Sequence, residues 1–77
     1  MEIDADMIRG GERVEIRGRR RVEVEGVGKI LSYERECVRL QLARETLRIE
    51  GCRLECVFYR EKEVAVEGRI DGISFED

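Results

Sequence analysis

The sequence predicts a single all-β domain, and three observations lead to that prediction. The chain has 77 residues, which is enough for one small domain with a thin core. From Arg13 onward, apolar and charged residues alternate with a period of two, which is typical of strands with one face on a core and one in water. Glycines follow four of the alternating runs, at positions 18, 26, 51 and 68, and punctuate the strands.

The predicted architecture is an antiparallel sandwich or a partly open barrel of about seven or eight short strands. Residues 1–11 show no usable period and are predicted to form a flexible tail or a short edge strand, so the domain itself spans residues 12–77. A short β-solenoid is the alternative, because an internal repeat with glycine corners would also suit stacked coils.

Six alternating runs define most of the predicted strands. Residues 34–45 also hold good helix formers, but only a strand keeps the three apolar side chains of that segment on one face. The apolar members of the runs are, in chain order, Val14 and Ile16; Val22 and Val24; Val38, Leu40 and Leu42; Leu47 and Ile49; Leu54, Cys56 and Phe58; and Val64 and Val66. The predicted core consists of these residues and of Leu31, Tyr33, Ile70, Ile73 and Phe75.

The internal repeat has the pattern apolar, any, apolar, Glu, Gly, four residues, apolar, any, aromatic. Its three copies carry the Glu-Gly pair at residues 25–26, 50–51 and 67–68, and they end on Tyr33, Phe58 and Phe75. Each copy predicts a strand, a glycine turn and a second strand, as in a β-hairpin or a β-arc. We expect the aromatic rings to pack in the core, so that Phe58→Ala would cost about 3–5 kcal/mol.

The distribution of charged residues is typical of a soluble surface and not of a nucleic-acid-binding one. They form 43% of the chain, with 15 basic and 18 acidic residues interspersed and a net charge of -3, so nucleic acid is not an expected partner. The one basic cluster consists of Arg17, Arg19, Arg20 and Arg21. It is a candidate site for an anion, a partner protein or an anionic membrane surface, and the alternative function that it suggests is an anion- or nucleic-acid-binding β module. The alternative is that it forms the charged face of a hairpin, balanced by neighbouring glutamates.

The sequence offers little for catalysis or for holding a cofactor. It has no histidine, and its three cysteines, Cys37, Cys52 and Cys56, fit neither a zinc site nor a disulfide between the last two, which would lie roughly 13 Å apart along a strand. We therefore expect a protein that is not an enzyme and that carries no metal or cofactor, with Cys52 and Cys56 buried as small apolar residues. The odd cysteine count, and a longest apolar run of only four residues at 56–59, predict a reducing, cytoplasmic setting without a membrane span.

Four segments carry a resemblance to a known family. They are GKILSY at residues 28–33, VRL at 38–40, LRIEG at 47–51 with Leu54 behind it, and EVAVEGRIDGISF at 63–75, with a weaker VEVEG at 22–26. In these segments the chain resembles the YabP/YqfC family of sporulation proteins from endospore-forming bacteria, and it is more similar to the YqfC branch. The resemblance implies a small non-enzymatic structural or interaction protein, made in the mother cell during spore formation. It implies no catalytic residues for this chain, because the family has no active site.

The expected partners are proteins. A small open sheet leaves edge strands with unpaired backbone groups, and this sequence has no proline to protect them. We therefore expect a homo-oligomer, most simply a two-fold dimer, with the arginine-rich hairpin at residues 13–25 and the last strand at residues 69–75 as the expected participants. The family resemblance adds another sporulation protein as a partner.

Overall fold

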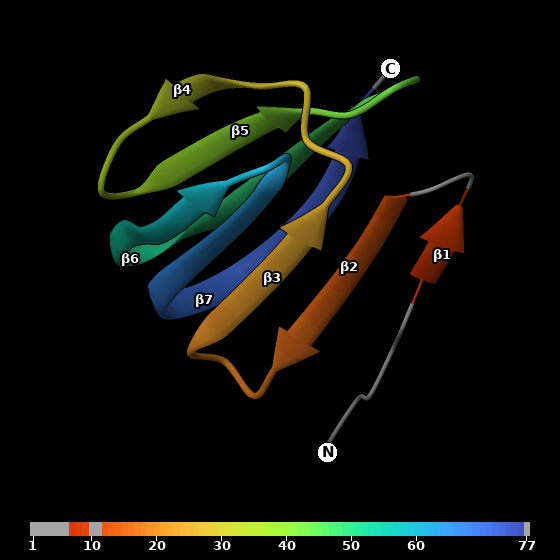
Figure 1. Ribbon diagram of the computed structural model, residues 1–77. Helices are drawn as coiled ribbons and strands as arrows, with labels where there is room; N and C mark the ends of the chain where they lie inside the picture. Colours follow the sequence, from red (N-terminus) through yellow and green to blue (C-terminus); the bar gives the residue numbers. More distant parts are fainter. Residues whose placement is uncertain (1–6, 10–11, 77) are drawn as a thin grey trace.

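The computed structural model describes residues 7–9 and 12–76, and in these ranges the chain consists of strands and turns without a helix (Figure 1). This confirms the predicted all-β fold, including a strand in place of a helix within residues 34–45. The strands are β1 (Met7–Arg9), β2 (Glu12–Arg17), β3 (Arg21–Glu25), β4 (Lys29–Tyr33), β5 (Cys37–Gln41), β6 (Thr46–Arg60) and β7 (Glu63–Glu76).

The strands form one antiparallel sheet in the order β1-β2-β3-β7-β6-β5-β4. Strands β1 and β4 lie at its two ends, so the sheet curls without closing, and the antiparallel pairing excludes the β-solenoid, whose coils stack in parallel. Within the segment predicted as a tail or short edge strand, Met7–Arg9 pair with β2; the other residues of 1–11 lie outside the described residues.

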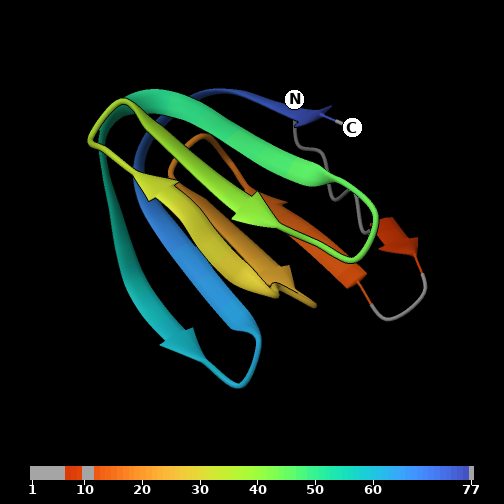
Figure 2. The same ribbon diagram turned by 90° about the horizontal axis from the view of Figure 1, so that it is seen from above.

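Strands β6 and β7 differ from the prediction of short strands, because they are 15 and 14 residues long. Each bends along its length (Figure 2), and each contains a glycine where the β6–β7 pairing is irregular. The Glu-Gly pairs at residues 50–51 and 67–68 were expected to end strands at hairpins or arcs, and that expectation is wrong at both places. Gly51 and Gly68 lie inside continuous strands, next to shifts in the β6–β7 register. The repeat therefore marks two bends that lie against each other.

The bends bring the two halves of the sheet together around one core. Residues of β2, β3 and the first half of β7 face residues of β5 and the first half of β6 across it. Val27 and Ala65 are buried although they were not predicted to be. The buried apolar residues are Val14, Val22, Val24, Val27, Val38, Leu40, Leu42, Leu47, Ile49, Leu54, Val64, Ala65, Val66 and Ile70; Ile16, Ile30, Cys56, Ile73 and Phe75 pack against them while partly exposed.

Three residues predicted for the core are instead exposed: Leu31 by 40%, Tyr33 by 50% and Phe58 by 39%. For Leu31 and Phe58 the cause is local irregularity of the ladders, since an extra residue reverses the face on which the following side chains lie. Tyr33 lies opposite Val38 at the end of β4, which is an edge strand. One shift lies between Ile30 and Ser32, and Ile30 rather than Leu31 packs on the core. Another lies between Cys56 and Phe58, so Cys56 faces the core and Phe58 faces outward. The stability loss expected for a buried Phe58 does not apply.

Glu76, near the end of β7, connects three strands through two arginines. Arg39 and Arg48 lie directly opposite each other on β5 and β6, a pairing of like charges that would by itself be destabilising. The Glu76 carboxylate accepts hydrogen bonds from Arg39 Nη2 at 3.0 Å and from Arg48 Nη1 at 3.2 Å. The hydrogen bond from Arg39, followed by that from Arg48, lowers the pKa of Glu76.

Replacing Glu76 should make thermal stability less sensitive to acid. A carboxylate whose pKa is lowered by folding stabilises the protein above its ordinary value of 4.5, and this stabilisation is lost as the pH falls below that value. Glu76→Gln should therefore lower the Tm at pH 7, and the difference from wild type should shrink between pH 5 and pH 3. Circular dichroism melts across that range measure it, and a constant difference would contradict the prediction.

Candidate functional site: the arginine-rich turn

The four predicted site residues lie where β2 turns into β3. Arg17 ends β2 and Arg21 begins β3, with Arg19 and Arg20 in the turn between them. Gly18 has a φ of +60°, a left-handed conformation that glycine adopts without steric cost, and Arg20 N donates to Arg17 O at 3.4 Å. The sequence therefore places four guanidinium groups on one tight turn.

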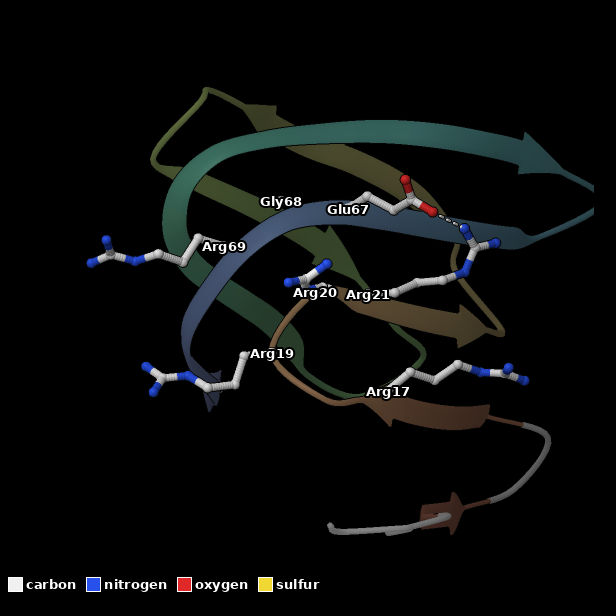
Figure 3. Close-up of a pocket in the computed structure, with 7 residues that line it drawn as sticks. All are labelled: Arg17, Arg19, Arg20, Arg21, Glu67, Gly68 and Arg69. Carbon is white, nitrogen blue, oxygen red and sulfur yellow. Dashed lines mark hydrogen bonds and ion pairs between the residues drawn. The ribbon is translucent and has the colours of Figure 1, made fainter. Parts of the chain in front are cut away.

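This turn is hydrogen-bonded to the bend of β7. Gly68 N donates to Arg20 O at 3.1 Å, and Ile70 N donates to Arg19 O at 2.8 Å. The attachment brings Arg69 and Glu67 beside the predicted cluster, from a part of the chain about 50 residues away. Together they line an open surface depression, which we call the arginine hollow (Figure 3); it consists of Arg17, Arg19, Arg20, Arg21, Glu67, Gly68 and Arg69.

Acidic side chains neutralise most of the arginine hollow. Arg17 lies 3.2 Å from a carboxylate oxygen of Glu15, and Arg21 pairs with Glu23 at 2.7 Å and also with Glu67. The hydrogen bond that Arg21 donates to Glu23, followed by the one that it donates to Glu67, raises the pKa of Arg21, and the bond from Arg21 lowers the pKa of Glu23. The guanidinium groups on this side of the hollow are therefore held by protein carboxylates.

Asp71 pairs with arginines on the other side of the arginine hollow. It lies 3.5 Å from Arg19 and 3.3 Å from Arg69. Within the described part of the chain, only Arg20 of these five arginines has no ion-pair partner. Figure 3 shows Arg19 and Arg69 extending to one side and Arg17 and Arg21 to the opposite side, with Arg20 between them. The guanidinium groups diverge and do not converge on one anion.

The cysteines differ in part from their prediction. Cys52 is exposed, not buried, while Cys56 and Cys37 are partly exposed, and all three are free thiols. Cys52 follows directly on the bend at Gly51, and its pairing with Arg69 places it outside the core. Burial raises the pKa of the Cys56 thiol. Across residues 7–9 and 12–76, no group of three His, Cys, Asp or Glu side chains is placed to hold a metal ion.

Comparison with known proteins identifies the family. The model of the YabP family matches residues 9–77. The chain belongs to the YabP family. This confirms the resemblance at the level of the family, and the closer likeness to the YqfC branch stays a prediction. No curated protein sequence matches this YabP family member. The described residues include no helix that is long and apolar enough to cross a membrane.

Sequence reasoning missed two parts of the surface of this YabP family member. It did not include Arg69 or Glu67 in the basic cluster, although the Glu-Gly repeat at residues 67–68 was a signal for a close approach of backbones there. It also placed Phe58 in the core, whereas Val57, Phe58 and Tyr59 are exposed next to one another on β6. No pattern in the sequence marked the bulge that turns Phe58 outward.

Proposed function

We propose that this chain is a non-enzymatic structural or interaction protein of spore formation. It acts in the mother-cell cytoplasm, where it contacts another sporulation protein and further copies of itself. The observation that carries the proposal is membership of the YabP family, whose model matches residues 9–77. The sporulation role comes with the family, and the protein-contact role is our own extension of it.

The surface supports a role in protein contacts. In a chain with 43% charged residues, five large apolar side chains are exposed by 39–57%, and these are Leu31, Tyr33, Val57, Phe58 and Tyr59. Tyr33 lies beside the second half of β6, since its hydroxyl accepts a hydrogen bond from Cys56 N at 3.0 Å. Tyr33 and residues 57–59 therefore lie in one region of the surface, and exposed apolar side chains gathered in this way are typical of a contact surface.

Deletion of the gene in its spore-forming host tests the sporulation role. We expect fewer heat-resistant spores, and we expect a copy expressed only in the mother cell to restore them, while a copy expressed only in the forespore does not. A tagged mother-cell copy should also retain a second sporulation protein during purification. Normal spore yield and resistance after deletion would contradict the proposal.

A salt titration separates this proposal from anion binding by the arginine hollow. Phosphate contacts made by arginines weaken steeply with salt, and four carboxylates already balance the hollow. We expect no binding to duplex DNA or to vesicles rich in anionic lipid at roughly 150 mM salt. Tight, salt-dependent binding that Arg20→Glu abolishes would favour an anion-binding module.

A further inference from the structure

The second half of β6 presents an open sheet edge. Strand β5 pairs with β6 only over residues 46–50, whereas β7 pairs with it as far as Arg60. Beyond the bend, Leu54 N donates to Arg35 O at 2.8 Å and Cys56 N donates to the Tyr33 hydroxyl. Residues 57–60 have β7 on one side, and on the other side no strand among those the structure describes.

The arginine-rich hairpin, one of the two expected dimer edges, is less available than this one. Both strands of the arginine-rich hairpin have neighbours on each side, since β1 pairs with β2 and β7 pairs with β3. The open edge of β6, in contrast, carries three exposed apolar residues, Val57 by 43%, Phe58 by 39% and Tyr59 by 57%. It lacks the proline and lysine residues that usually protect an edge from pairing with another strand.

The segment at this edge is complementary to itself. When two copies of Glu-Cys-Val-Phe-Tyr-Arg (residues 55–60) run antiparallel, Val57 can lie opposite Phe58 of the second copy. In that register Cys56 lies opposite Tyr59, and Glu55 lies opposite Arg60, each pair occurring twice. The Cys56 amide then exchanges its hydrogen bond to the Tyr33 hydroxyl for one to the second copy. Glu55 and Arg60 are exposed, and within the described residues neither has an ion-pair partner in its own chain.

The faces of the strand also agree with this register. Glu55 and Arg60 lie opposite Glu67 and Glu63 of β7, on the face directed away from the core. Cys56 and Tyr59 lie opposite Val66 and Val64, whose side chains are in the core. The Glu55–Arg60 and Cys56–Tyr59 pairs therefore each join side chains on the same face of the sheet, as a continuous antiparallel sheet requires. The Val57–Phe58 pair lies between them, at the bulge of β6.

We propose that two copies of the chain associate through residues 55–60 of β6, which pair antiparallel across a two-fold axis and join the two sheets into one. The inference rests on the proposed function, in which the chain works through protein contacts. The occupant is a second copy because the charges and apolar side chains of the edge match their own two-fold image. Two Glu55–Arg60 ion pairs between the copies set the register.

Charge exchange tests this interface by sedimentation of the full chain over a hundred-fold range of concentration. Wild type should sediment as a dimer of about 18 kDa, twice the 9.0 kDa of the chain. Glu55→Arg places arginine opposite Arg60, and Arg60→Glu places glutamate opposite Glu55, so each should raise the dimer Kd about tenfold. The double variant, Glu55→Arg with Arg60→Glu, restores opposite charges and should return the Kd to within about threefold of wild type.

Arg44→Glu is the matched control, because Arg44 is exposed in the turn between β5 and β6, outside residues 55–60. The dimer Kd of this variant should equal that of wild type. Circular dichroism confirms that each variant is folded. A monomer mass at all concentrations would overturn the inference and would favour a strand from a different protein at this edge. A dimer that the single exchanges leave unchanged, or that the double variant fails to restore, would overturn it as well. Neither result bears on spore formation in the deletion strain, so failure of the interface and failure of the proposed function are distinguishable.

Discussion

Gly51→Ala should lower the free energy of unfolding by more than about 3 kcal/mol and leave little folded protein at 37 °C. A Cβ at this position would lie 1.9 Å from the carbonyl oxygen of Arg69 and 3.1 Å from Leu54 Cδ2. The oxygen belongs to the backbone of the neighbouring strand, so it cannot move without separating β6 from β7 at their bends. Since a 77-residue domain has a total stability of roughly 4–12 kcal/mol, this loss is a large part of it.

Gly72→Ala is the matched control for this substitution. Gly72 also lies in β7, but a Cβ there would meet no heavy atom within 4 Å, so stability should change by less than about 1 kcal/mol. Gly68→Ala should resemble Gly51→Ala, because a Cβ would lie 2.5 Å from Arg53 O and the backbone φ is +143°. Urea unfolding followed by circular dichroism measures all three. Similar midpoints for Gly51→Ala and Gly72→Ala would contradict the close approach at the bend.

Leu47→Ala should destabilise the domain by about 3–4 kcal/mol, because it removes a large side chain from the centre of the core. Leu47 is fully buried and lies between Leu40 of β5 and Phe75 of β7 in the pairing of the strands. The loss combines the free energy of burying the removed methyl and methylene groups with the cost of the cavity they leave. For a domain of this size it corresponds to a Tm decrease of roughly 12–30 °C.

Leu31→Ala provides the comparison, since it makes the same chemical change at a residue that is 40% exposed. Its expected loss is below about 1.5 kcal/mol, because a large part of its surface stays in water after folding and its removal leaves no enclosed cavity. Calorimetry of both variants gives the Tm values. Equal losses of stability in the two variants would contradict the exposure of Leu31 and would favour its predicted place in the core.

The bends show where prediction from the sequence ended. A glycine after an alternating run permits either a turn or a bend. The residues around Gly51 and Gly68 do not indicate which of the two forms. Which one forms depends on the strand that lies alongside: β6 and β7 continue through their glycines because each pairs with the other on both sides of the bend. The repeat was visible in the sequence, and its structural meaning was not.

The arginine-rich turn also has one part that the sequence predicts and one part that it does not. Arg17, Arg19, Arg20 and Arg21 were found from the sequence because they are neighbours in it, but the Glu67 and Asp71 carboxylates that neutralise them lie about 50 residues away. A charge cluster can be counted along the chain, whereas its net field depends on every charge that folding brings near it. In the structure this candidate cluster is part of a nearly balanced network of charges.

The sequence by itself determined that this is an all-β member of the YabP family, and which face of β2, β3 and β5 is buried, because strand alternation is local and each run carries its own pattern. Only the tertiary structure decided the exposure of Phe58, since a single bulge at Val57 moves its side chain to the other face. It also decided which edge stays open, because β5 ends its pairing at the bend of β6. Bulges and unpaired edges depend on how strands of different length meet, and that is a property of the whole sheet.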